Sequence, residues 1–174
     1  MRVSRSPLSL AAAACLALTA PPAVESATRT ANFIVRVNVV SDCTISATAL
    51  DFGTLTLTPA GVLAADMTSS SQILVTCTPL APYEIALNAG TGSGSTIAAR
   101  NMDNGAGATV PYQLYTANDF ATIWGDGANT TSTVGETGTG SQQTFTVHGR
   151  INAPLPSQPP VGSYSSIVTA TITY

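Results

Sequence analysis

The chain has 174 residues, a length typical of one domain, and only 9% of them are charged, with a formal net charge of −3. Lysine is absent, so the composition lacks the basic patch that a nucleic-acid-binding surface requires. One histidine and three cysteines leave few residues for imidazole or thiol chemistry.

Residues 1–26 have the pattern of a secretory signal peptide with an approximate cleavage site. Arg2 and Arg5 precede a short apolar run from Leu8 to Ala20, and small residues follow. The run is too short to span a bilayer, and we expect no membrane span in the mature chain. Cys15 inside the run raises the alternative of a lipoprotein leader. The pattern predicts a chain that is exported.

Removal of the leader leaves two cysteines, Cys43 and Cys77. Two cysteines in an exported chain normally form a disulfide, so we expect this pair to be bridged. On the chain-entropy model, the closed loop would contribute about 3–4 kcal/mol to stability. The alternative is two free buried thiols.

The first predicted strand, Phe33–Val39, lies directly behind the leader. Its inward face would carry Phe33, Val35, Val37 and Val39. Arg36 and Asn38 lie on the other face, where Ile34 is the apolar exception. Further extended or alternating runs are predicted at 43–46, 50–57, 73–77, 83–89, 110–115 and 144–151. Between them lie turn-forming clusters rich in Gly, Pro and Thr.

The chain closes on a predicted strand over Gly162–Tyr174. Its apolar face carries Tyr164, Val168, Ala170, Ile172 and Tyr174. About seven short strands separated by turns predict an all-β fold, an antiparallel sandwich of immunoglobulin-like kind. Trp124 follows both cysteines, so the Cys…Trp…Cys spacing of true immunoglobulin domains is absent.

Residues with catalytic or metal-binding chemistry are sparse. His148 is expected to be an exposed strand histidine, with a ligand or general base as the alternative. Asp103–Gly105 and Asp126–Asn129 are expected to form turns rather than calcium sites. Gly90–Gly94 lacks the lysine of a phosphate-binding loop. We therefore predict no enzymatic activity, no cofactor and no metal site.

The first and last strands each have an apolar face and no neighbour in sequence. Within one chain they would pair and close the sandwich. Between chains, the first strand of one subunit would fill a groove beside the last strand of the next, which is β-augmentation by strand donation. Periodicity alone leaves both arrangements open.

Motifs across the whole mature chain resemble the spore coat protein U domain family. The matching segments are Phe33–Val35 ahead of Cys43, Asp51–Gly53, Val75–Cys77, Arg100–Met102, Tyr112–Tyr115, Trp124–Gly127, Val147–Ile151, Gly162–Tyr164 and Thr171–Tyr174. Members of this family are pilin subunits of archaic chaperone–usher pili. The resemblance implies an incomplete immunoglobulin-like sandwich that is completed by a donated strand.

The resemblance divides the mature chain into a donor segment, residues 27–40, and a pilin domain, residues 41–174. It implies that Phe33–Val39 is the donated strand and that Tyr164–Tyr174 is the groove edge which a chaperone holds. The implied partners are a periplasmic chaperone, an outer-membrane usher and identical or related pilins. The implied location is a surface pilus that supports adhesion or biofilm formation. The rival function is a self-closed secreted module that binds carbohydrates or surfaces.

Overall fold

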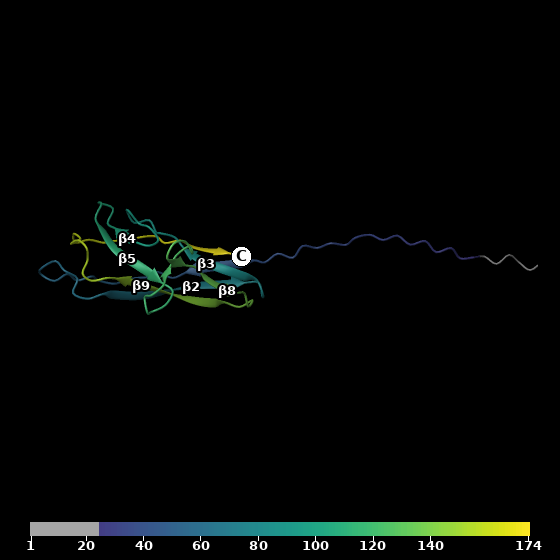
Figure 1. Cartoon of the computed structure of the whole chain (residues 1–174), viewed down its shortest axis with the longest axis horizontal. Helices are drawn as coiled ribbons and strands as arrows, with labels where there is room; N and C mark the ends of the chain where they lie inside the picture. The colour runs from purple at the N-terminus through teal and green to yellow at the C-terminus, as the bar shows by residue number, and fades with distance from the viewer. Residues whose placement is uncertain (1–24) are drawn as a thin grey trace, which may run out of the picture. The chain divides into compact units, whose positions relative to one another are not determined.

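The computed structural model describes residues 25–174, and every regular element in this range is a β-strand (Figure 1). The predicted signal peptide, residues 1–26, lies outside this range except for its last two residues. Residues 25–42 contain neither strand nor helix. Over the described range, no helix is long and apolar enough to cross a membrane.

Within residues 25–174, ten strands form two sheets. They are β1 (Cys43–Ala47), β2 (Met67–Cys77), β3 (Pro82–Leu87), β4 (Arg100–Asp103), β5 (Thr109–Tyr115), β6 (Ile123–Trp124), β7 (Thr131–Ser132), β8 (Val134–Thr137), β9 (Gln143–Ile151) and β10 (Ala170–Thr173). The larger sheet has the order β1-β2-β9-β5-β6-β7, with β4 paired to β5, and the smaller has the order β10-β3-β8. Every ladder is antiparallel except the short β6–β7 pair.

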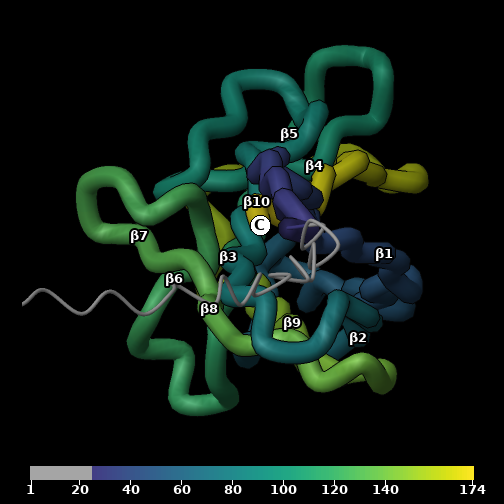
Figure 2. The backbone as a smooth tube through the Cα atoms, turned by 90° about the vertical axis from the view of Figure 1, so that its right-hand side faces the viewer, coloured from purple at the N-terminus to yellow at the C-terminus, as the bar shows by residue number. Residues whose placement is uncertain are grey.

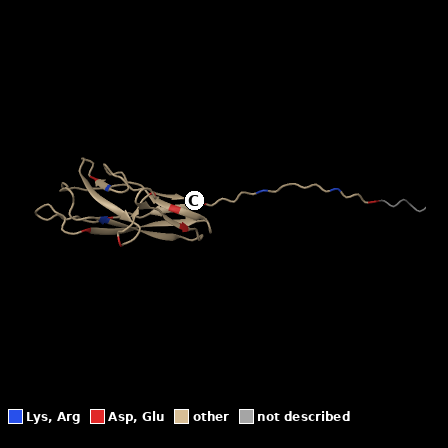
Figure 3. Cartoon of the chain, viewed as in Figure 1, with Lys and Arg blue, Asp and Glu red and all other residues tan. Residues whose placement is uncertain are grey.

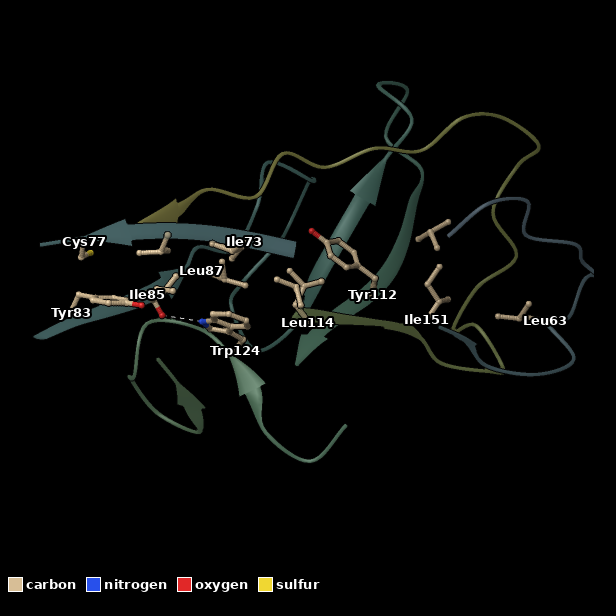
Figure 4. Packing of buried hydrophobic residues seen from close by; sticks show 13 residues of the cluster. Leu63, Ile73, Cys77, Tyr83, Ile85, Leu87, Tyr112, Leu114, Trp124 and Ile151 are labelled. Atoms are coloured by element: carbon tan, nitrogen blue, oxygen red, sulfur yellow. Dashed lines mark hydrogen bonds between the residues drawn. The ribbon is translucent and has the colours of Figure 1, made fainter. Parts of the chain in front are cut away.

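The core lies between the two sheets, because inward side chains alternate with outward ones along β2, β3 and β9. Figure 4 shows the resulting row of buried side chains, which includes Ile73, Ile85, Leu114 and Ile151. Trp124 is 1% exposed, and its indole Nε1–H donates to the Ile85 carbonyl at 2.9 Å. The predicted all-β sandwich is confirmed.

A disulfide joins Cys43 to Cys77, as predicted. The two residues are directly opposite each other in the β1–β2 ladder. The bridge therefore ties the first strand of the domain to the end of its only strand partner. Because β1 has no second neighbour, this covalent link fixes the position of a strand that would otherwise be a weakly held edge.

Three predicted strands differ in the structure. Phe33–Val39 forms no strand, because an alternating segment needs a partner for its backbone groups and residues 25–42 have no ladder. Leu50–Leu57 forms only one isolated bridge, between Leu57 and Leu63. The terminal strand is shorter than predicted, since β10 covers only Ala170–Thr173 and Ser165 adds an isolated bridge to Asp103.

Strands β4, β6, β7 and β8 were not predicted, and β2 begins at Met67, before the predicted run at 73–77. The sequence of β4 is Arg-Asn-Met-Asp, and β8 contains a glycine, so neither has a clear apolar alternation. Both are short edge strands whose extended conformation follows from the partner beside them, β5 for β4 and β3 for β8.

Candidate functional site

Two edge strands of the domain, β1 and β10, lie beside the same cavity. Within residues 39–174, β1 pairs only with β2, and β10 pairs only with β3. Figure 2 shows β10 beside β3 and β1 beside β2 in this domain. Both open edges border the same cavity, since Ala47 of β1 and Ala170 of β10 line it together. The sandwich is therefore unclosed along one side.

The cavity between the edges is a groove of about 350 Å³. Its lining is mainly apolar, and it consists of Ala47, Thr48, Ala49, Leu50, Phe52, Ser71, Ile73, Leu87, Met102, Tyr112, Leu114, Val147, Ser166, Ile167, Val168 and Ala170. None of these side chains is charged. Figure 3 shows that the charged residues of the domain are few and scattered. Burial raises the pKa of the Tyr112 phenol above its usual value, so this lining residue is neutral at physiological pH.

The segment before β10 is held on one side by hydrogen bonds of its odd-numbered residues. Ser165 exchanges two backbone hydrogen bonds of 3.0 Å with Asp103. The Ile167 N–H donates to Thr91 Oγ1, and the Thr169 N–H donates to Asn88 Oδ1, both at 2.9 Å. The Thr169 carbonyl in turn accepts from the Asn88 N–H at 3.1 Å. The odd residues thus direct their backbone groups toward the domain.

The even-numbered residues of the same segment direct their backbone groups to the open side. This follows because successive residues of an extended strand present N–H and C=O groups to opposite edges. Ser166, Val168, Ala170 and Ile172 therefore offer donors and acceptors to a further strand. Their side chains are half-buried, whereas those of the odd residues are exposed. One edge thus combines free backbone groups with an apolar face.

A buried arginine positions this edge. Arg100 is 0% exposed and donates to the carbonyls of Leu87, Asn88, Ile97 and Trp124, as well as to Gln113 Oε1. Because the Asn88 carbonyl is occupied by the guanidinium, the Thr169 N–H binds the Asn88 side chain instead. Burial lowers the pKa of Arg100 below its usual value, but a guanidinium stays protonated in proteins.

The predicted donor residues are all strongly exposed. Phe33 is 86% exposed, Val35 81%, Val37 83% and Val39 88%. Four large apolar side chains on one face of an extended segment thus face solvent, which is unusual unless a partner covers them. Nothing in the structure places this segment against a strand.

Four of the five residues predicted on the inward face of the terminal segment pack partly buried against the core: Tyr164, Val168, Ala170 and Ile172. The fifth, Tyr174, is 54% exposed. It lies beyond the last ladder pair, Thr173 with Glu84, so no neighbouring strand covers it.

The remaining candidate sites have structural explanations. His148 lies half-buried on the polar face of β9, in register with Ser70 and Tyr115. Asp103 and Asp126 each accept a hydrogen bond from the backbone N–H two residues later, the geometry of an Asx turn. Among residues 25–174, no three His, Cys, Asp or Glu side chains are placed to hold a metal ion.

Sequence patterns missed the residues that position the groove edge. Arg100, Asn88 and Thr91 act through hydrogen bonds to backbone groups that are distant in sequence. The only available signal was an arginine next to two alanines in a chain with few charges, and nothing in that context distinguishes a buried guanidinium from an exposed one.

The model of the Spore Coat Protein U domain family matches residues 29–171. No curated protein sequence matched the chain. Among solved structures, the chain is similar to the CsuC–CsuE complex of a chaperone and a tip adhesion subunit, from archaic chaperone–usher Csu pili of Acinetobacter baumannii. The identity is 22% and the TM-score 0.53, with 78% of this chain and 40% of that chain covered.

A second match is a chaperone–tip adhesin complex of CFA/I fimbriae, at 12% identity and TM-score 0.36, covering 75% of this chain and 42% of that chain. The chain therefore spans less than half the length of either solved chain. The similarity to the Csu complex shows that the fold is the immunoglobulin-like fold of such subunits.

Proposed function

This chain belongs to the Spore Coat Protein U domain family, and on that premise we propose that it is a structural pilus subunit polymerised by donor-strand exchange. In this mechanism, residues 33–39 of one copy enter the groove between β1 and β10 of the next. The observation that carries the proposal is the combination of that open, uncharged groove with an exposed alternating segment in the same chain.

The two surfaces match chemically. The donor offers one aromatic and three β-branched side chains on one face, and the groove offers apolar walls and a strand edge with free backbone groups. Burying four such side chains contributes roughly 6–12 kcal/mol before association and ordering costs, at about 1.5–3 kcal/mol each. Because the contact is head-to-tail, repetition produces an open fibre rather than a closed ring.

The open groove also determines which partners the subunit needs during assembly. Before polymerisation, its open edge needs a temporary strand, because an unpaired apolar edge would otherwise pair with any available strand. We propose that a periplasmic chaperone lends this strand and that an outer-membrane usher is the site of exchange. The subunit would then be non-enzymatic and located in a surface pilus that serves adhesion or biofilm formation.

Deleting residues 28–40 tests the proposal. The shortened chain keeps the groove, so it is expected to form the same 1:1 complex with its chaperone as the full mature chain. It lacks the donor, so fibre yield should fall to background. The measurement is co-purification with the chaperone, followed by electron microscopy and size analysis of the assembled material.

The matched control replaces residues 28–32 with a Gly/Ser segment and leaves 33–39 intact. This variant should assemble at close to the normal yield, because the donor face is preserved. Fibres of normal yield from the chain without 28–40 would contradict the proposal. Such a result, with a monomer that never needs a chaperone, would favour the self-closed binding module instead.

A further inference from the structure

We infer the register of the exchanged strand: residues 33–39 of one copy lie antiparallel to residues 164–170 of the next, with Phe33 directly opposite Ala170. This inference rests on the proposed function, because it specifies how that groove is filled. The sizes of the inward side chains select this register, and two apolar residues on the outer faces argue against the neighbouring register toward Ile172.

The direction follows from where the ends of the domain lie. The Thr78 N–H binds the Asp42 carbonyl at 3.0 Å, and Thr173 pairs with Glu84 just beyond the same turn. The start of the domain and the end of β10 are therefore at one pole. A parallel donor would bring the donating domain to this pole, where the recipient's own tail must leave. An antiparallel donor places it at the opposite pole and permits a head-to-tail fibre.

The inward side chains fix the register through size. Directly opposite residues share a face, so the odd-numbered donor residues oppose the even-numbered residues of the groove edge. Ala170 has the smallest apolar side chain on the inward face of the groove edge, and Ala47 and Ala49 line the same groove. Phe33 is the largest donor side chain, and packing a large residue against small ones fills such a space best. Phe33 opposite Ala170 places Val35 opposite Val168.

The outer faces argue against the register that is shifted toward Ile172. Ile34 is the apolar exception on the polar face of the donor and is 76% exposed. Ile167 is the corresponding exception on the groove edge and is 71% exposed. With Phe33 opposite Ala170, Ile34 is a diagonal neighbour of Ile167, a separation that long side chains bridge. A shift of two residues toward Ile172 would place Ile34 opposite Thr171 and separate the two isoleucines. The opposite shift would place Ile34 directly opposite Ile167, but it would set Phe33 against Val168 instead of Ala170, and side-chain size argues against that pairing.

In this register, a short linker remains between the donated strand and β1 of the donating domain. Val39 would face Tyr164 at the end of the groove edge, and residues 40–42 would connect the donor to the disulfide-bonded start of β1. A shift toward Ile172 would draw this linker into the groove and bring the two domains closer.

Engineered cysteines measure the register in assembled fibres. Asn38→Cys is combined in the full chain with Ser165→Cys, which would be its directly opposite partner in the next copy. The same Asn38→Cys is also combined with Ile167→Cys or with Ser163→Cys. These two pairs would be directly opposite only if the donor were shifted by two residues in one direction or the other. All four positions are on the exposed outer face, so folding is preserved. Only directly opposite cysteines meet the distance limits of a disulfide.

After oxidation of fibres assembled with chaperone and usher, we expect a ladder of covalent oligomers on a non-reducing gel for the Ser165→Cys pair. It should exceed the other two pairs at least tenfold. A stronger ladder from either shifted pair, or no ladder from any pair in well-formed fibres, overturns the register and leaves the proposed function standing. Absence of fibres from the unsubstituted chain would overturn both.

A size exchange provides the second measurement. Ala170→Leu fills the space opposite Phe33, so fibre yield should fall at least tenfold, and adding Phe33→Ala should restore most of it. Adding Val35→Ala instead should restore little. Recovery through Val35→Ala but not through Phe33→Ala would show that Val35 opposes Ala170 and would overturn the register.

Discussion

Replacing both Val35 and Val37 with Asp is expected to lower fibre yield by about a thousandfold or more while leaving the chaperone complex intact. Both side chains would enter a groove without a charged lining residue. An unpaired carboxylate buried in such a place costs several kcal/mol. A total cost of about 4 kcal/mol already corresponds to a thousandfold weaker association. Fibre yield is measured by sedimentation, and chaperone binding by co-purification.

The control for this prediction changes the same segment on its outer face. Arg36→Asp with Asn38→Asp adds the same two carboxylates, but both would stay in solvent. Assembly should change by no more than a few fold. Normal fibre yield from the Val35 and Val37 double variant would contradict the role of residues 33–39 as the donor.

Replacing Arg100 with Met is expected to cost about 3–5 kcal/mol of stability. The guanidinium binds four backbone carbonyls and the Gln113 side chain inside the core. Methionine preserves much of the volume but donates no hydrogen bond, so buried acceptors lose their partners at about 1–3 kcal/mol each. The chaperone complex should melt about 10 °C lower or fail to accumulate. The groove edge would also be affected. Asn88 would lose the hydrogen bonds from Arg100 to its carbonyl, and its side chain accepts the hydrogen bond from the Thr169 N–H.

Arg150→Met is the matched control, because it removes the same charge from the surface. Arg150 pairs with Asp66 and lies over the Phe120 ring at 5.2 Å, with a third of its side chain exposed. Exposed ion pairs contribute about 1 kcal/mol or less, so this variant should accumulate normally. Equal melting temperatures for the two variants would contradict the account of Arg100.

The sequence predicted β3, β5 and β9 because apolar and polar side chains alternate along them. It predicted only the second half of β2, because residues 67–72 are mostly Ser and Thr and carry no apolar alternation. It misassigned Leu50–Leu57, where alternation reflects packing without a ladder. The side chains of Leu50 and Phe52 pack closely over Gly149, where a Cβ atom would lie only 2.9 Å from each of them. Burial of that kind produces the pattern of a strand without strand pairing.

The candidate site could be predicted only in outline. The alternation of residues 33–39 and 164–174 was compatible with both a closed sandwich and an open groove, and the resemblance to the family implied the open groove. The residues that hold the groove edge were not predictable, because Arg100 acts on carbonyls that come together only in the folded chain. The outer-face isoleucines, Ile34 and Ile167, were visible in the sequence, but their relation depends on which backbone edge of residues 164–172 is free.

Amide hydrogen exchange at residues 164–172 is the most direct test of the central claim that this edge accepts a strand from another copy. In the isolated chain without residues 28–40, the amides of Ile167 and Thr169 should be protected, and those of Ser166, Val168 and Ala170 should exchange rapidly. In assembled fibres, both sets should be protected. Protection of Ser166, Val168 and Ala170 already in the isolated monomer would show that the edge is closed within one chain and would contradict the account.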